Sequence, residues 1–119
     1  MAAHKNFING EWVEGKGITV DINPSDISDV VGEYGQADVA QTHEAIAAAK
    51  AAFPAWSMTT PQQRADALEM IGVELLARKD EIGRMLSREE GKPLGNGIAE
   101  TTRAAQIFKL FAQLPSPGP

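Results

Sequence analysis

The sequence predicts an α+β chain in which a short β-meander is followed by three to four amphipathic helices. Residues 7–34 carry apolar and β-branched residues in alternation or around turn dipeptides, as strands do. From residue 38 onward, apolar residues recur every three or four positions, as on one face of a helix. Hydrophobic residues make up 43% of the 119 residues and charged residues 23%, a composition that predicts a folded chain.

The predicted meander begins with a hairpin over residues 7–13. Apolar residues flank Asn9-Gly10, the dipeptide that best tolerates the two positive φ angles of a type I′ turn. Residues 18–22 alternate apolar and polar side chains, and residues 30–34 are rich in β-branched and aromatic ones, so both predict strands. Asn23-Pro24-Ser25-Asp26 predicts the turn between them. We therefore assign residues 1–36 to the meander.

The first predicted helix begins after Asp38, which forms a capping-box pattern with Gln41. Pro54 limits this helix near its end. Its apolar residues follow a 3-4-3-4-3 spacing that places them in one stripe. The stripe consists of Val39, Thr42, Ile46, Ala49, Phe53 and Trp56.

The second predicted helix has Thr60 as N-cap and Pro61 at its first position, with Gln63 completing a capping pattern. Its periodicity breaks or bends near residues 79–80 and resumes until Gly91 and Pro93 stop it. A last helix is predicted over residues 98–113. We assign residues 37–114 to a helical layer and residues 115–119 to a Pro-rich tail, together one incomplete domain.

The charge and composition exclude several classes of partner. The net charge is −5, and the longest basic run is the pair Arg78-Lys79, so we expect no nucleic-acid partner. No apolar run approaches the roughly 18 residues that span a bilayer, so we expect no membrane partner and a cytoplasmic location. The absence of cysteine excludes disulfides and thiol nucleophiles.

The residues themselves show no catalytic constellation. His4 and His43 are the only histidines, both at positions that predict exposed side chains, and they cannot build a catalytic relay or a zinc site. The glycine-rich residues 91–97 lack the preceding strand of a phosphate loop and predict a helix stop followed by a turn. Glu89 and Glu90 are adjacent, so on a helix they diverge by about 100° and cannot flank one bond.

Five motifs, taken in order, nevertheless resemble the N-terminal portion of the NAD(P)-dependent aldehyde dehydrogenase superfamily. Each motif is weak alone, but together they span nearly the whole chain, from Phe7 to Phe111. The motifs are Phe7-Ile8-Asn9-Gly10-Glu11-Trp12, Ile22-Asn23-Pro24-Ser25, Ala48-Ala49-Lys50-Ala51-Ala52-Phe53-Pro54-Ala55-Trp56, Arg64-Ala65 with Leu68, and Glu90-Gly91-Lys92-Pro93-Leu94 with Glu100.

The resemblance implies an enzyme that oxidises aldehydes to carboxylic acids with NAD or NADP. Within the family, the sequence is more similar to enzymes that act on small semialdehydes. In that family a cysteine thiolate, an activating glutamate and a glycine-rich cofactor turn lie in later sequence, so we carry over no catalytic and no cofactor-binding residue. We expect this chain to be an N-terminal fragment that is inactive alone and binds no cofactor by itself. The alternative is a non-enzymatic module that binds a partner, such as a full-length relative, through its helical face.

The resemblance also implies where the chain would sit. Its strands and helices resemble the outer layer of the family's cofactor-binding domain, whose helices bury one face against later sequence. Without that sequence, an apolar face containing Ile46, Phe53, Leu75 or Phe108 would favour self-association.

One ligand site is implied by the resemblance alone. Several family members hold a monovalent cation with backbone carbonyls before the Asn-Pro turn and an acidic side chain before the Gly-Lys-Pro motif. The matching positions here are Asp21, Ile22 and Glu89. Carbonyl and carboxylate oxygens suit such a hard cation. The alternative for Glu89 is plain solvation at the end of a helix.

Overall fold

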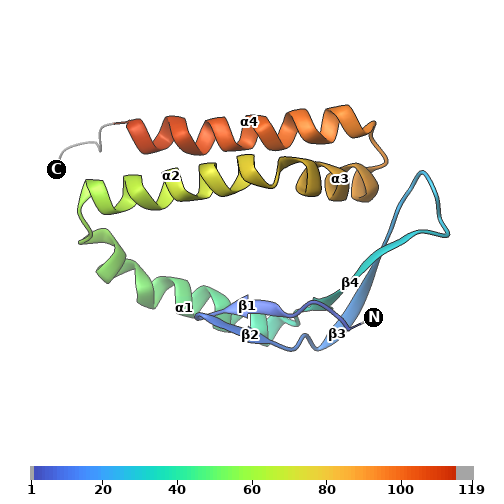
Figure 1. Cartoon of the computed structure of the whole chain (residues 1–119). Coiled ribbons are helices and arrows are strands. Elements are labelled where there is room, and N and C mark those ends of the chain that lie inside the picture. Colours follow the sequence, from blue (N-terminus) through green and yellow to red (C-terminus); the bar gives the residue numbers. More distant parts are fainter. Residues whose placement is uncertain (1, 115–119) are drawn as a thin grey trace. The chain divides into compact units, whose positions relative to one another are not determined.

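The computed structural model describes residues 2–114, and the predicted tail at residues 115–119 lies outside them. Four strands precede four helices (Figure 1), which confirms the predicted fold class. The elements, in order, are β1 (Asn6–Ile8), β2 (Glu11–Val13), β3 (Gly17–Ile22), β4 (Val30–Gln36), α1 (Val39–Ser57), α2 (Pro61–Ala77), α3 (Lys79–Glu90) and α4 (Leu94–Gln113).

The chain divides into two compact units, Met1–Met58 and Thr59–Pro119. Helix α1 belongs to the first unit, together with the four strands. The meander predicted from the sequence ends at residue 36, where the periodicity changes from that of strands to that of a helix. In the structure, α1 is grouped with the strands in one compact unit. None of the helices among residues 2–114 is both long and apolar enough to cross a bilayer.

The first hairpin of unit 1 forms as the sequence predicts. Strands β1 and β2 pair antiparallel, with Phe7 opposite Trp12. Asn9 and Gly10 have φ angles of 52° and 82°, the two positive values that a type I′ turn requires. The rings of Phe7 and Trp12 lie 4.9 Å apart between centroids, a cross-strand aromatic pair that stabilises the hairpin.

The predicted meander is two separate sheets in the described residues. Strands β3 and β4 pair antiparallel as a second ribbon, with an irregularity in register between Asp21 and Ile22. An isolated parallel bridge joins His4 to Tyr34 in β4, and the two rings stack at 5.0 Å. The segment before β1 is thereby held to β4 at His4.

Helix α1 is attached to the hairpin by one buried amide. The Asp38 side chain accepts a hydrogen bond from the Gln41 backbone N–H at 2.8 Å, as a capping residue does. The reciprocal half of the predicted capping box does not form, because the Gln41 side chain is used elsewhere. Gln41 Oε1 accepts from Asn6 Nδ2 and Gln41 Nε2 donates to the Glu14 carbonyl, both at 2.9 Å. Only 5% of Gln41 is exposed.

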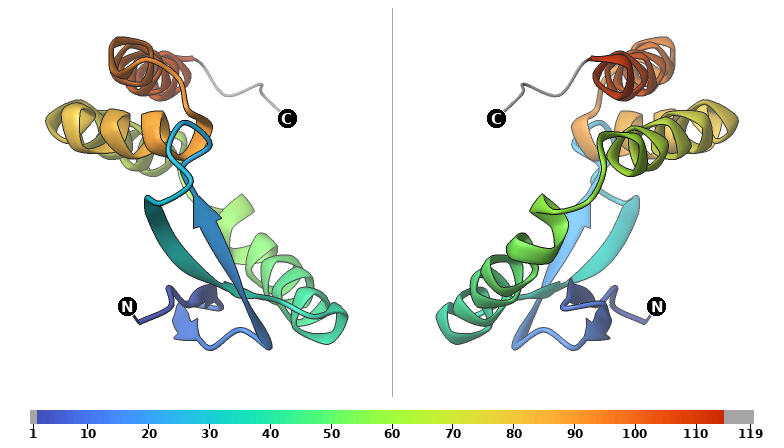
Figure 2. Two further views of the ribbon diagram at one scale, coloured as in Figure 1. Left: turned by 90° about the vertical axis from the view of Figure 1, so that its right-hand side faces the viewer. Right: turned by 90° about the vertical axis from the view of Figure 1, so that its left-hand side faces the viewer.

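Unit 2 is a helical hairpin in which α4 runs back along α2 and α3 (Figures 1 and 2). The predicted Thr60–Gln63 capping box is complete at the start of α2. The predicted break falls at Arg78, whose φ of −107° and ψ of 15° leave the helical region between α2 and α3. Gly91 ends α3 with a left-handed φ of 72°, as a C-terminal glycine does.

Helix α4 begins at Leu94, four residues earlier than the sequence predicts. The turn predicted over the last part of residues 91–97 is therefore wrong. Glycine and asparagine favour turns, but here Gly97 lies against Gly83 of α3 so closely that a Cβ atom would meet the Gly83 carbonyl oxygen. Helix packing thus outweighs local propensity. Thr101 and Ala105, one and two turns further along, are buried in the same contact face.

Candidate functional site

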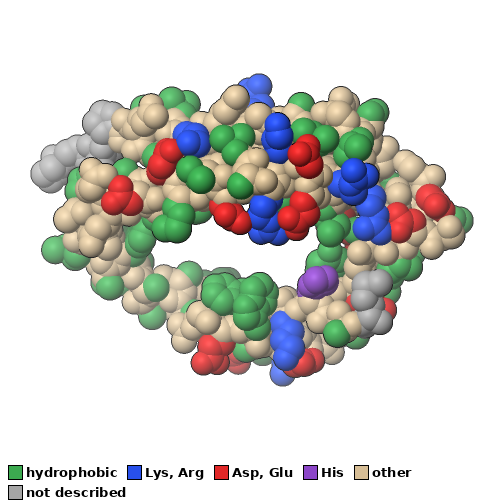
Figure 3. Space-filling view, in the orientation of Figure 1, with side chains coloured by type: hydrophobic (Ala, Val, Ile, Leu, Met, Phe, Trp, Pro, Cys, Tyr) green, Lys and Arg blue, Asp and Glu red, His purple; other side chains and the backbone are tan. Residues whose placement is uncertain are grey.

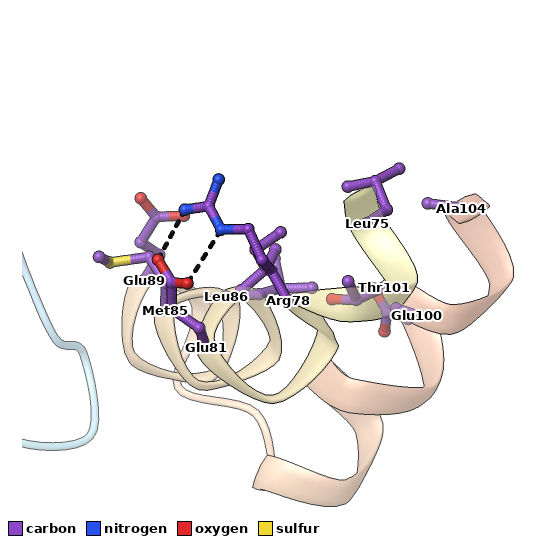
Figure 4. A pocket seen from close by; sticks show the side chains of 10 residues that line it. Leu75, Arg78, Glu81, Met85, Leu86, Glu89, Glu100, Thr101 and Ala104 are labelled. Carbon is purple, nitrogen blue, oxygen red and sulfur yellow. Dashed lines mark hydrogen bonds and ion pairs between the residues drawn. The ribbon is translucent and has the colours of Figure 1, made fainter. Parts of the chain in front are cut away.

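A groove of about 500 Å³ lies in unit 2, where α2, α3 and α4 meet (Figure 4). Its walls are mainly aliphatic, from Leu75, Ile82 and Leu86 together with Met85 and Ala104. Charged side chains reach its rim from the junction between α2 and α3, from α3 and from α4. They are Arg78, Glu81, Glu89 and Glu100.

Two of the rim charges are paired with each other. Arg78 Nε and Nη2 donate to the two carboxylate oxygens of Glu81 at 3.0 and 2.7 Å. This hydrogen-bonded ion pair raises the pKa of Arg78 and lowers that of Glu81. Both groups therefore stay charged at neutral pH. Because both side chains are largely exposed, the pair contributes little to stability and serves to hold the guanidinium in place.

A second ionic cluster joins the end of α3 to α4. Lys92 Nζ lies 2.6 Å from Glu90 Oε2 and 2.8 Å from Glu100 Oε2. The Lys92 side chain is only 17% exposed, so its charge is partly desolvated and depends on these carboxylates. The Ser87 hydroxyl donates to the Lys92 carbonyl and fixes the backbone at the same place. The hydrogen bonds to Glu100 and then Glu90 raise the pKa of Lys92.

Replacing Lys92 with methionine is expected to abolish a pH dependence of stability at alkaline pH. Because the folded chain raises this pKa above its ordinary value of 10.5, the stabilisation is fully present below that value and is lost as the pH rises through the folded pKa. The midpoint of urea unfolding, followed by circular dichroism from neutral to strongly alkaline pH, measures it. The exposed Lys79→Met variant is the control. An unchanged alkaline decline in Lys92→Met would contradict the assignment.

The residues implied as cation ligands fall in different units. Asp21 and Ile22 end β3 in unit 1, at the register irregularity, whereas Glu89 lies in the last turn of α3 in unit 2. Residues 2–114 contain no group of three histidine or acidic side chains placed to hold a metal. The cation site at Ile22 and Glu89 therefore stays a prediction.

Residues 2–114 combine polar groups at the groove with exposed apolar side chains elsewhere. The groove holds carboxylates, a guanidinium and a hydroxyl, but the chain has no cysteine to act as a thiol nucleophile. Hydrophobic side chains are exposed on both units (Figure 3). Sequence reasoning missed the Arg78–Glu81 and Lys92–Glu100 pairs. The first has a usable signal, since opposite charges three residues apart on a helix commonly pair.

Comparison with known proteins identifies this arrangement. The aldehyde dehydrogenase family matches residues 12–117, nearly the whole chain. The chain belongs to the aldehyde dehydrogenase family. The resemblance inferred from the five sequence motifs is thereby confirmed.

Curated relatives in this family are named for several semialdehydes and related substrates. The 1-pyrroline-5-carboxylate dehydrogenase 2 of Bacillus subtilis (strain 168) is 37% identical over 106 residues, which is 89% of this chain and 21% of that enzyme. The alpha-ketoglutarate semialdehyde dehydrogenase of Haloferax volcanii is 37% identical over 110 residues, covering 91% of this chain and 23% of the relative. The chain thus spans about a fifth of the length of the curated relatives it matches.

Solved structures of the family contain the same fold. The NADP-dependent glyceraldehyde-3-phosphate dehydrogenase of Bacillus halodurans C-125, complexed with NADP, matches with a TM-score of 0.89 and 27% identity, covering 94% of this chain and 24% of that one. A betaine aldehyde dehydrogenase of Staphylococcus aureus in complex with NAD⁺ matches at 0.87 and 26%, covering 92% and 23%. Both relatives bind a nicotinamide cofactor.

Proposed function

We propose that this chain forms the N-terminal layer of an NAD- or NADP-dependent enzyme that oxidises aldehydes, semialdehydes in particular, to carboxylic acids. The observation that supports it is the structural match at a TM-score of 0.89 over 94% of the chain to an NADP-bound relative. The semialdehyde preference rests on the names of relatives such as the Haloferax volcanii enzyme. By itself the 119-residue chain is proposed to be inactive.

The chemistry gives the reason for this proposed inactivity. Aldehyde oxidation through a covalent intermediate needs a nucleophile that forms an adduct with the aldehyde. The adduct must donate a hydride to become an ester or thioester, and water must then be able to cleave that bond and release the nucleophile. A thiolate meets both needs, and this chain has no cysteine. The role of unit 1 and unit 2 would then be architectural: to form a layer of the fold that holds the cofactor.

The exposed apolar side chains favour a second candidate, a non-enzymatic module that binds a partner through its helices. Phe53 is 64% exposed, and Trp56 and Ile46 on the same helix are also largely exposed. Such a concentration of apolar surface marks an interaction site. The two candidates differ in whether the chain can replace the matching part of an active enzyme.

A chimera separates the two candidates. The matching N-terminal part of the Bacillus subtilis relative would be replaced by residues 1–114 of this chain, and NAD⁺ and NADP⁺ reduction would be assayed with a panel of semialdehydes. We expect no turnover from the chain alone and restored turnover in the chimera. A chimera carrying Gly97→Val, which disrupts α3–α4 packing, is the matched control.

Two outcomes would contradict the proposal. Turnover by the cysteine-free chain alone would show that it holds a different nucleophile. A chimera that folds and binds NAD⁺, but turns over no aldehyde, would show that this chain cannot serve as the enzyme's N-terminal layer and would favour the interaction module.

A further inference from the structure

The chain has four asparagines, and two of them are followed by glycine. These two are Asn9, in the turn of the first hairpin, and Asn96, in the first turn of α4. In an Asn-Gly pair the glycine nitrogen can attack the side-chain carbonyl carbon of the asparagine, because glycine has no Cβ atom to hinder the approach and its backbone turns freely. Asparagine is also among the chemically labile residues. The same reactive dipeptide thus occurs in two structural settings.

The setting of Asn9 leaves the reacting groups open. Asn9 and Gly10 are both exposed, and a Cβ atom built on Gly10 would meet no described residue beyond its chain neighbours within 4 Å. The hydrogen bond typical of a type I′ turn joins the residues on either side, here Ile8 and Glu11, and does not use the Gly10 N–H. Strands β1 and β2 have three residues each, and such a short two-stranded hairpin opens at little cost. Water therefore reaches the Gly10 nitrogen, and opening frees the backbone of Asn9 to rotate toward it.

The setting of Asn96 is closed. The Gly97 N–H donates to the Pro93 carbonyl at 3.3 Å, within the first turn of α4. Gly97 is also buried against α3, where a Cβ atom would lie 2.3 Å from the Gly83 carbonyl oxygen. The backbone rotation that brings the Gly97 nitrogen to the Asn96 side chain would break this turn and separate α3 from α4. The tertiary structure therefore protects the second Asn-Gly pair.

The other two asparagines are protected by their neighbours. Asn23 precedes Pro24, whose backbone nitrogen carries no hydrogen and cannot form the imide. Asn6 precedes the bulky Phe7 in β1, and its Nδ2 donates to Gln41 Oε1 at 2.9 Å. This bond must be lost before the Asn6 side chain can turn to the following nitrogen. Asn9 is thus the asparagine that combines an unhindered nitrogen with an open backbone.

We propose that Asn9-Gly10 is a site of spontaneous covalent modification and that opening of the β1–β2 hairpin controls its rate. The Gly10 nitrogen gives its proton to water or hydroxide and forms a bond to the side-chain carbonyl carbon of Asn9. The bond from that carbon to the amide nitrogen breaks, and the nitrogen leaves as ammonia. The product is a cyclic imide. Water then adds to either of its two carbonyls and opens the ring, which leaves aspartate or isoaspartate at position 9.

The two products affect the hairpin differently. Each adds one negative charge to a chain whose net charge is −5. Aspartate tolerates the positive φ of 52° at position 9 much as asparagine does, so the turn persists. Isoaspartate routes the backbone through the former side chain and lengthens it by one carbon atom. The register that places Phe7 opposite Trp12, with their rings 4.9 Å apart, would then be lost.

Mass spectrometry of the full chain, incubated in mildly alkaline buffer and then digested with trypsin, tests the site. The tryptic peptide of residues 6–16 contains Asn9, and that of residues 89–103 contains Asn96. In the folded chain we expect Asn9 to react at least roughly tenfold faster than Asn96 and to give two products of equal mass. In urea the two sites should react at similar rates, because the same dipeptide is then free at both.

The variant Asn9→Gln is the control for the site. Its longer side chain cannot close the same ring, so the more acidic form of the protein should fall to the background set by the other asparagines. Isoelectric focusing of the intact chain measures this form directly, because each event adds one negative charge.

Substitution of Gln41 tests the control by the hairpin. Gln41 holds the hairpin to α1 through Asn6 Nδ2 and the Glu14 carbonyl. Gln41→Leu should therefore raise the population of open hairpin and accelerate the reaction at Asn9 by at least roughly fivefold. Gln62→Leu, at an exposed glutamine of α2, should leave the rate unchanged. Mass and charge are the only readouts, so the result is independent of the proposed enzyme function.

Four results would overturn the proposal. Equal rates at Asn9 and Asn96 in the folded chain would show that the structure does not direct the reaction. An Asn96 that stays slow in urea would show that helix packing is not its protection. An acidic form that persists in Asn9→Gln would place the reaction elsewhere. An unchanged rate in Gln41→Leu would show that opening of the hairpin does not control it.

Discussion

Replacing Gly97 with alanine is expected to destabilise unit 2 by about 2–3 kcal/mol, although alanine is the better helix former. A Cβ atom at this position would lie 2.3 Å from the Gly83 carbonyl oxygen and 3.2 Å from the Gly83 carbonyl carbon. Both are backbone atoms of α3, so the contact cannot be relieved by turning a side chain. The helices must move apart, and the buried Thr101 and Ala105 would lose their close packing.

Circular dichroism during urea unfolding measures this effect selectively. Both tryptophans, Trp12 and Trp56, lie in unit 1, so tryptophan fluorescence reports on that unit while the helical signal also includes unit 2. We expect the helical transition to shift to lower urea while the fluorescence transition stays in place. A shift in fluorescence alone would contradict the assignment of Gly97 to the α3–α4 contact.

Gly95→Ala provides the matched control. Gly95 lies in the same helix, two residues before Gly97, but a Cβ atom there would meet nothing within 4 Å. The substitution should stabilise the chain by roughly 0.5–1 kcal/mol, because it restricts the unfolded chain at no steric cost. Each variant adds one methyl group, at sites two residues apart, and the two should change the free energy of unfolding in opposite directions. Equal effects would show that helix propensity, and not close approach, governs this helix.

Replacing Gln41 with leucine is expected to detach the first hairpin from α1 at a cost of about 2–3 kcal/mol in unit 1. Leucine keeps most of the volume but removes the hydrogen bonds to Asn6 Nδ2 and the Glu14 carbonyl. These partners are part-buried, so each loses a bond that water replaces only incompletely. The backbone bond to Asp38 remains, and α1 itself should therefore persist.

Tryptophan fluorescence during urea unfolding and amide hydrogen exchange test this prediction. The exchange of amides in β1 and β2, around Trp12, should accelerate, while the amides of α4 should remain protected. Gln62→Leu is the control, because Gln62 is an exposed helical glutamine whose side chain donates a hydrogen bond to the exposed Asp66 carboxylate. We expect that substitution to change stability by less than about 0.5 kcal/mol. A similar loss of stability in both variants would show that Gln41 does not hold the hairpin to α1.

The sequence by itself determined the local structure of this protein. The Asn9-Gly10 turn, the Thr60 capping box and the Gly91 helix end all formed as predicted. Each depends on φ and ψ preferences and on hydrogen bonds within about four residues, which a sequence motif specifies directly. The spacing of the apolar stripe of α1 could also be read from the sequence, since helical periodicity fixes which side chains share a face. The ordered motifs also gave the family.

Only the tertiary structure decided which distant groups meet. The Gln41 side chain bonds to Glu14 and Asn6, which lie 27 and 35 positions earlier in the chain. Gly97 is helical because Gly83 lies against it. Lys92 and Glu100 are paired across the start of α4. These contacts depend on how elements pack, which no local preference encodes. For the same reason the sequence could name an apolar face but could not say that the hairpin covers a different side of α1.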